Sequence, residues 1–188
     1  MKNCVICIII FLFIFSCGKR QNNSEQVSVN SEVLLNREKD ALVLINSIAS
    51  FCKIDGDNSL FGYQDYCGGL YIDEFKNVVI IIVGDTNLHR KAIAKKIGRN
   101  DFLVQSGKYS YSMLKSILNE LVSFYKNVDN DSIIQEVGLK QFGLSIHKNS
   151  IYIKLKDCNQ TKIDLFKEKI MNAPVFVFEN SSGPAIME

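Results

Sequence analysis

The stretch GGLYIDEFKNVVIIIVGD, residues 68–85, decides the fold because it has the pattern of a β-hairpin. Leu70 and Ile72 alternate with Tyr and Asp, as in a strand that buries one face. The letters EFKN supply charged and turn-forming residues between two strands. Residues 78–83 are an unbroken β-branched run, which is typical of a strand buried on both faces.

A helix and a further strand are predicted after this hairpin. Residues 88–98, LHRKAIAKKIG, have helical composition, and Gly98 is a typical helix stop. Residues 102–105, FLVQ, form a short apolar run with strand character. The sequence therefore predicts a hairpin–helix–strand unit over about residues 66–106.

The same order of elements recurs about 73 residues later along the chain, over about residues 142–179. Residues 142–157, FGLSIHKNSIYIKLKD, predict a second hairpin, followed by a helix ending at Ile170 and a strand, VFVF, at 175–178. A repeat on this scale indicates one supersecondary unit used twice. The letters match as Gly69 with Gly143, Leu70 with Leu144, Ile72 with Ile146, Asn77 with Asn149, Val79 with Ile151, Ile81 with Ile153 and Val83 with Leu155, with the second turn two residues shorter.

Two further helices are expected, over about residues 31–52 and 112–125, from apolar stripes at helical period. The prediction is an α+β fold of two related hairpin–helix–strand units, with mainly antiparallel sheet and flanking helices. Whether the strands form one continuous sheet or two small sheets stays open. The strand SIYIKLK, residues 150–156, carries lysines on its outer alternation and is expected at a sheet edge that could add a partner's strand.

The first 17 residues, MKNCVICIIIFLFIFSC, have the pattern of an export signal. Lys2 gives a positive start, and residues 4–15 form an apolar run shorter than the roughly 20 residues that span a bilayer. The ending, with Ser16 before Cys17, resembles the lipobox of bacterial lipoproteins. An uncleaved N-terminal anchor is the alternative, against which the shortness of the run argues.

The lipobox resemblance implies a signal peptide over residues 1–16 and acyl chains such as palmitate on Cys17. More than one chain makes membrane attachment stable. The implied location is a cell membrane of the bacterial envelope, inner or outer, on the exported side. Residues 17–30 are polar and without periodicity, which predicts a flexible tether before the α+β domain at 31–188.

Three cysteines, Cys52, Cys67 and Cys158, lie beyond Cys17 in the chain. A disulfide between Cys52 and Cys67 would close a loop of about 15 residues and contribute about 3 kcal/mol. The alternative, which the sequence leaves open, is that all three are small buried hydrophobic residues. Three isolated cysteines and two histidines do not suggest a structural zinc site.

Charge and composition exclude several classes of function. The 188 residues are 47% hydrophobic and 22% charged, with a net charge of +2, so the chain is globular and nucleic acid is not an expected partner. We find no phosphate-binding loop, no catalytic triad and no cofactor motif, and we expect no enzyme. A basic helix is the one candidate contact for an anionic surface or partner, through Arg90, Lys91, Lys95, Lys96 and Arg99.

The order of elements over residues 66–179 resembles the pro-regions of bacterial chymotrypsin-like proteases, the α-lytic protease and streptogrisin type. That resemblance implies two small α+β lobes that bind a protein. The sequence holds no protease domain, so the implied role is a protein- or peptide-binding module, anchored at the envelope and not catalytic. An anchored enzyme of unknown reaction and a structural envelope protein are the alternatives.

Overall fold

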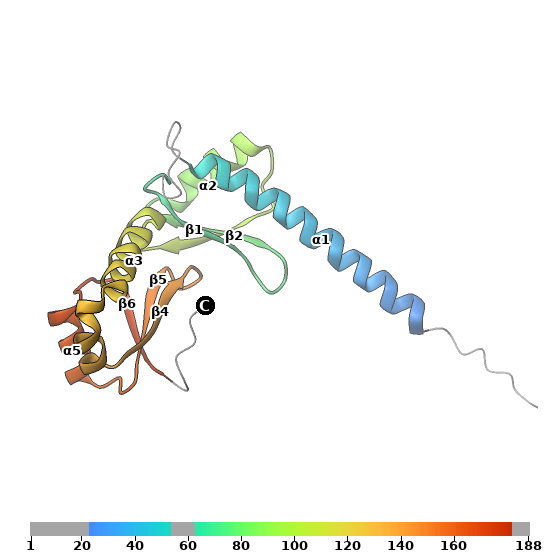
Figure 1. Cartoon of the computed structure of the whole chain (residues 1–188). Coiled ribbons are helices and arrows are strands. Elements are labelled where there is room, and N and C mark those ends of the chain that lie inside the picture. The colour runs from blue at the N-terminus through green and yellow to red at the C-terminus, as the bar shows by residue number, and fades with distance from the viewer. Residues whose placement is uncertain (1–22, 54–62, 182–188) are drawn as a thin grey trace, which may run out of the picture. The chain divides into compact units, whose positions relative to one another are not determined.

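The computed structural model describes residues 23–53 and 63–181, and side chains from Leu35 onward (Figure 1). Both predicted units are present, and each holds a hairpin, a helix and a third strand. The elements are α1 (Asn23–Cys52), β1 (Cys67–Ile72), β2 (Val78–Val83), α2 (Thr86–Ile97), β3 (Leu103–Gly107), α3 (Tyr111–Lys126), a 3-10 turn (Val128–Asn130), α4 (Asp131–Val137), β4 (Leu139–Ser145), β5 (Ser150–Leu155), α5 (Gln160–Lys169) and β6 (Phe176–Asn180).

The strands form two separate sheets of three strands each, with orders β1-β2-β3 and β4-β5-β6. In each sheet the hairpin is antiparallel, whereas the third strand pairs in parallel with the central strand because a helix carries the chain back across the sheet. The α+β fold with two related units is thus confirmed, with mixed sheets. We call residues 37–107 the first lobe and residues 111–181 the second lobe.

β5 is the central strand of the second sheet, so the prediction that residues 150–156 form an edge was wrong. Its apolar side chains explain its place, since Ile151, Ile153 and Leu155 are fully buried. The edges of this sheet are β4 and β6. Lys154 alternates with buried residues because it lies on the other face of the sheet. On that face Lys154 and Tyr152 are half-buried.

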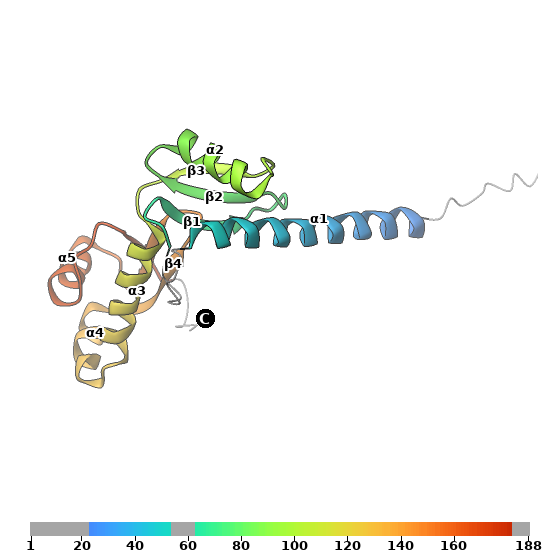
Figure 2. The same cartoon turned by 90° about the horizontal axis from the view of Figure 1, so that it is seen from above.

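The core of the first lobe lies between its sheet and two helices. α2 covers one face of the strands, as Figure 2 shows, and the last part of α1 packs into the same core. α2 ends at Gly98, as the sequence predicts, and begins two residues before the predicted start. Asp85 accepts hydrogen bonds from the backbone N–H groups of Asn87 and Leu88, and Gly98 ends the helix in a left-handed conformation with φ of 70°.

The second lobe has an aromatic core beneath α3 and α5. Phe166 of α5 is fully buried, and its ring meets those of Phe176 and Phe178 edge-on at centroid distances of 5.5 and 5.3 Å. α3 contributes Leu114 and Leu121 to the same core. The periodic stripe predicted for residues 112–125 therefore includes the two residues that α3 buries fully.

The structure corrects how the two copies correspond, residue by residue. Val79 was matched with Ile151, but Val79 lies on the face of β2 away from the helix-covered core, whereas Ile151 lies inside such a core. Six consecutive β-branched residues show no alternation, so the sequence could not indicate which of them face the helix. The equivalent positions are Leu70 with Phe142, Ile72 with Leu144, Val78 with Ile151, Ile80 with Ile153, Ile82 with Leu155 and Ile93 with Phe166.

The second hairpin turn is shorter than the first, as predicted, but by one residue and not by two. Five residues lie between the last pair of the first hairpin, Ile72 with Val78, and four lie between Ser145 and Ser150, the last pair of the second. Each hairpin also has an irregularity in register near the start of its first strand. In the first hairpin it falls at Gly68, and glycine within a strand often marks such a bulge.

α1 begins eight residues before the expected start, so residues 23–30, predicted as part of the tether, are helical. The stretch from 23 to 52 contains no glycine or proline, and a helix once started gains a hydrogen bond for each added residue. The chain divides into two compact units at residues 36 and 37, within α1. Among residues 23–53 and 63–181, no helix has the length and apolar character needed to cross a bilayer.

The turn of the second hairpin joins the two lobes through one buried side chain, Asn149. Its Oδ1 accepts hydrogen bonds from the backbone N–H groups of Lys108 and Tyr109 at 2.8 and 2.7 Å. Its Nδ2 donates to the carbonyl oxygens of Gly68 and Tyr109 at 3.0 and 2.8 Å. The amide thus makes all four hydrogen bonds available to it, and we call this set the Asn149 clasp.

Glycine is required where the clasp meets the first sheet. A Cβ atom on Gly68 would lie 2.7 Å from a methyl group of Ile81 and 3.1 Å from Asn149 Nδ2. On Gly107 it would lie 2.3 Å from the same methyl group. The second turn therefore covers the face of the first sheet that the helices leave open, and Ile81 is fully buried for this reason.

Candidate functional site

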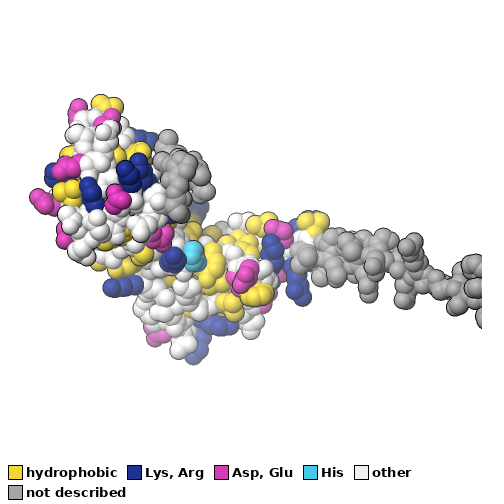
Figure 3. Space-filling view, turned by 90° about the horizontal axis from the view of Figure 1, so that it is seen from below, with side chains coloured by type: hydrophobic (Ala, Val, Ile, Leu, Met, Phe, Trp, Pro, Cys, Tyr) yellow, Lys and Arg dark blue, Asp and Glu magenta, His cyan; other side chains and the backbone are white. Residues whose placement is uncertain are grey.

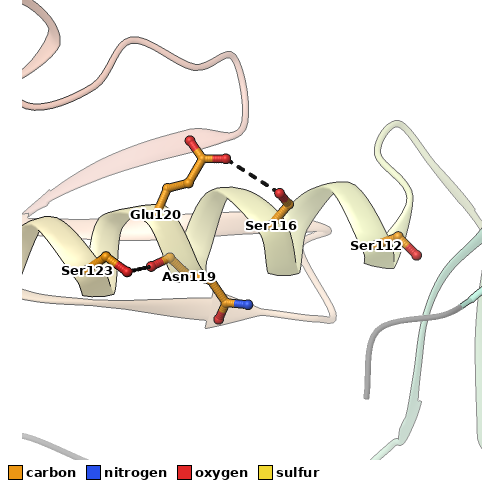
Figure 4. Close-up of a pocket in the computed structure, with 5 residues that line it drawn as sticks. All are labelled: Ser112, Ser116, Asn119, Glu120 and Ser123. Atoms are coloured by element: carbon orange, nitrogen blue, oxygen red, sulfur yellow. Dashed lines mark hydrogen bonds between the residues drawn. The ribbon is translucent and has the colours of Figure 1, made fainter. Parts of the chain in front are cut away.

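α3 has two different exposed sides. One is polar and shallow, with a depression of about 530 Å³ lined by Ser112, Ser116, Asn119, Glu120 and Ser123 (Figure 4). Two of its hydroxyls bond within the helix, Ser116 to Glu120 at 3.4 Å and Ser123 to the Asn119 carbonyl at 2.9 Å. This side is an ordinary solvated helix face.

The other side of α3 forms an apolar groove with the edge strand β4. The groove has a volume of about 660 Å³. Tyr125 meets Phe142 edge-on at a centroid distance of 5.4 Å, and Gln141 Nε2 donates to Tyr152 Oη at 3.3 Å. The residues that line it are Leu118, Val122, Tyr125, Lys126, Lys140, Gln141, Phe142, Gly143, Leu144 and Tyr152. We call this set the β4 groove.

Gly143 shapes the floor of the β4 groove. A Cβ atom at this position would lie 2.6 Å from Tyr152 Oη and 2.8 Å from the adjacent ring carbon. Only glycine lets the Tyr152 ring lie against β4. The groove thus follows the backbone of an edge strand, whose outer backbone groups lie outside the sheet ladder.

The charges around the β4 groove are all of one sign. Lys126 and Lys140 are among its lining residues, and no lining residue is acidic. In the described part of the chain, neither lysine makes an ion pair. The groove therefore presents apolar and aromatic surface with a positive rim, which favours an apolar segment that carries negative charge.

The two lobes correspond to two known families of domain. Residues 20–107 match the Pro-like N-terminal domain family, and residues 112–181 match the Pro-like C-terminal domain family. The two matches lie one after the other along the chain. The matches support the resemblance to a protease pro-region and fit the internal repeat. A comparison with curated proteins finds no significant relative.

The basic helix of the first lobe is α2. Of the five residues predicted to contact an anionic surface, two make contacts within the protein and three are exposed lysines. Arg99 binds Asp40 with two hydrogen bonds, at 2.9 and 2.8 Å, and also Asp101. Arg90 donates to the Asn100 carbonyl and lies over the Phe102 ring. The exposed lysines of the set are Lys91, Lys95 and Lys96. On the face drawn in Figure 3, basic and acidic side chains are interspersed.

The Asp40–Arg99–Asp101 cluster predicts a small pH dependence of stability. The hydrogen bonds from Arg99 hold the pKa of Asp40 and of Asp101 below the ordinary value. A lowered pKa in the folded state adds stability above the unfolded value of about 3.9, and that stability is lost as the pH falls through the lower folded pKa. We expect Asp40→Asn to lower the thermal midpoint slightly at pH 7 and not at about pH 2.

Thermal unfolding of the parent and of Asp40→Asn across this range measures the effect. Glu168→Gln is the matched control, because exposed Glu168 makes no ion pair in the described residues. A difference between parent and Asp40→Asn that persists at the acid end would contradict the assignment.

The predicted lipidation residue, Cys17, lies outside the described residues. Cys52, Cys67 and Cys158 are free thiols in the structure, the first two buried and the third half-buried. Cys52 and Cys67 lie in the same core cluster of the first lobe. The disulfide between them stays a prediction.

Asp73, His89 and His147, whose side chains could in principle take part in acid–base catalysis, do not converge. Asp73 accepts hydrogen bonds from the backbone of Phe75 and Asn77 at 2.9 and 2.7 Å, so it stabilises its own turn. His89 stacks on Tyr66 with ring centroids 4.1 Å apart. His147 lies in the exposed turn of the second hairpin, and its carbonyl oxygen accepts from Gln105. Among the described residues, no group of three or more His, Cys, Asp or Glu could hold a metal ion.

Sequence reasoning missed the β4 groove. The apolar stripe at 112–125 predicted a helix but not which of its residues enter the core, and Leu118, Val122 and Tyr125 are only half-buried. Val122 could have indicated the groove in the sequence. It is apolar and follows the buried Leu121, so it makes the apolar stripe of the helix wider than a single contact with the core requires. The partner strand of the groove, β4, was predicted, but not its place at the edge.

Proposed function

We propose that this protein is an envelope lipoprotein, anchored through acyl chains on Cys17, whose Pro-like domains bind an extended segment of another protein without catalysing a reaction on it. The observation that carries the binding role is the β4 groove, an apolar surface along an edge strand. The matches to the two Pro-like domains support the same role, because they agree with the resemblance to protein-binding pro-regions.

The geometry of the β4 groove favours an extended partner. A segment laid along an edge strand can pair with its backbone, while alternate side chains enter adjacent pockets. The groove offers Tyr125, Phe142 and Tyr152 as aromatic contacts, and aromatic residues are enriched at the centres of binding interfaces. Lys126 and Lys140 at the rim favour a segment with acidic residues beside its apolar ones.

Photo-crosslinking in native envelopes tests the binding site. With a photoreactive amino acid at position 140, we expect crosslinks to a small set of peptides that are apolar with acidic flanks. Val122→Arg places a charge and a long side chain in the groove, and we expect it to reduce crosslinking at least tenfold. Mass spectrometry of the crosslinked peptides is the measurement.

The control for this experiment lies on the polar side of the same helix. A photoreactive residue at position 116, or the change Ser116→Arg, alters α3 without touching the groove. Equal crosslinking from positions 116 and 140, or undiminished crosslinking in Val122→Arg, would contradict a role for the groove.

The lipid anchor is supported by the N-terminal pattern that ends in Ser16-Cys17. Each buried methylene contributes about 0.8 kcal/mol, so two or three acyl chains hold a domain on a bilayer stably. We expect the mature protein to begin at Cys17 and to carry added acyl mass. In Cys17→Ala we expect a complete loss of incorporated fatty acid, with residues 1–16 retained.

Intact-mass analysis and metabolic labelling with an alkyne fatty acid measure the anchor. Cys158→Ala is the matched control and should keep the label. A native protein that retains Met1 and has no added acyl mass would overturn the anchor, and it would leave the binding role of the groove to be judged by its own experiment.

A further inference from the structure

Cys52 and Cys67 are held together by the backbone at the point where α1 ends and β1 begins. The Cys52 carbonyl accepts a hydrogen bond from the backbone N–H of Gln64 at 2.8 Å, and the Gln64 carbonyl accepts from that of Cys67, also at 2.8 Å. Lys53 and Tyr63 form an antiparallel bridge beside them. This short ladder places both cysteines in one core cluster, where the interaction between their thiols shifts the pKa of each.

The two thiols have different surroundings. Both side chains are buried, with Cys52 0% and Cys67 1% exposed. Cys67 lines a cavity of about 230 Å³, together with residues of α1, β1, α3 and the second hairpin turn. A small reagent in this cavity would meet Cys67, with Cys52 placed behind it.

The interaction between the two thiols acts in the same sense as the cavity. It lowers the pKa of Cys67 against the opposing effect of burial, and together with burial it raises the pKa of Cys52. The thiolate is the nucleophile in thiol–disulfide exchange, and Cys67 is the cysteine that lines the cavity, so a reagent there would meet Cys67 first.

We propose that Cys52 and Cys67 form a dithiol that is oxidised by thiol–disulfide exchange, with Cys67 as the attacking and Cys52 as the resolving cysteine. The Cys67 thiolate attacks a small disulfide, forms a mixed disulfide and releases one thiolate. Cys52 then loses its proton and attacks Cys67 Sγ, which releases the second thiolate and leaves the Cys52–Cys67 disulfide. The external disulfide is reduced by two electrons, and the protein dithiol is oxidised by two.

The disulfide would join the end of α1 covalently to the first strand of the sheet. It would close the loop between them, which restricts the unfolded chain. We expect oxidation to raise the thermal midpoint by about 5–10 °C, a shift that added reductant reverses. The proposal concerns the first lobe and does not rest on the proposed binding function.

The test treats the full-length protein with 2,2′-dithiodipyridine and identifies its peptides by mass spectrometry over time. In the parent chain we expect a thiopyridyl adduct on Cys67 first and then a peptide pair linked through Cys52 and Cys67. In Cys52→Ser the adduct on Cys67 should accumulate, because no resolving thiol remains. In Cys67→Ser we expect Cys52 to stay unmodified, and Cys158→Ser is the control that should behave as the parent does.

Several outcomes would overturn the proposal. An adduct that appears first on Cys52, or a stable adduct on Cys67 in the parent chain, contradicts the order of attack. Oxidised protein without the linked peptides contradicts the pairing itself. Because the parent chain alone shows both the order and the link, the test holds even if a serine variant fails to fold.

Discussion

Replacing Asn149 with aspartate is expected to lower the free energy of unfolding by about 2–6 kcal/mol. The change is nearly isosteric, but it removes the two hydrogen bonds that Nδ2 donates to the carbonyl oxygens of Gly68 and Tyr109. Each buried carbonyl left without its donor costs about 1–3 kcal/mol. The carboxylate oxygen would also face these carbonyls in a buried site, and burial disfavours its charged form.

Urea unfolding at two pH values measures this effect. The folded state should raise the pKa of the introduced carboxyl above its unfolded value of about 3.9, so the loss of stability grows as the pH rises and shrinks in acid. Asn149→Gly keeps the positive φ of 49° without strain and removes only the amide contacts. We expect it to be destabilised as well, because the clasp is lost.

Lys76→Gly provides the matched control in the first hairpin, where Lys76 also has a positive φ, of 66°. It should leave stability unchanged or raise it slightly, since glycine adopts this conformation more easily. If Asn149→Asp proves as stable as the parent at neutral pH, the clasp does not join the lobes as described.

Removing the ring of Phe166 is expected to destabilise the protein by about 3–5 kcal/mol, and Ile93→Ala by about 2–5 kcal/mol. Both side chains are fully buried and lie at equivalent positions of α5 and α2. The Phe166 ring is also the centre of the three-ring cluster with Phe176 and Phe178. Its removal leaves the larger cavity and disconnects that cluster.

Chemical unfolding of both variants tests the equivalence of the two lobes. Val177→Ala is the control on the same strand as Phe176 and Phe178, because Val177 is 40% exposed and should change stability by less than about 1 kcal/mol. A loss of less than about 1 kcal/mol for either core variant would mean that its helix does not close the core of its lobe.

The order of helices and strands could be predicted because each depends on local pattern. The β-branched run at 78–83 forms β2, and Asp85 and Gly98 bound α2 as their types suggest. The repeat was visible for the same reason, since two copies of one unit need the same alternation and the same caps. Glycine within a strand is typical of a close backbone approach, and Gly68 meets the clasp in this way.

The position of each strand in its sheet, and the face of the strand that meets a helix, were predicted poorly because both depend on which elements pack against the strand. β5 and β4 have similar patterns, yet β5 is central and β4 is at the edge. The face of β2 that meets α2 was hidden because both faces are apolar and buried. On the first sheet the second face is covered by the turn that carries Asn149, whereas on the second sheet the equivalent face holds Tyr152 and Lys154 and borders the β4 groove.

Local chemistry thus accounts for the elements of this protein, their caps and their repetition, because hydrogen bonding and side-chain alternation act between residues near in sequence. The clasp, the thiol pair and the groove arise from contacts between residues far apart in the chain. Asn149 is 81 residues from Gly68, and its turn lies where it does because it buries the open face of the first sheet. The two copies of the unit differ because this sheet face is buried in the first lobe, whereas the equivalent face of the second lobe is only partly covered.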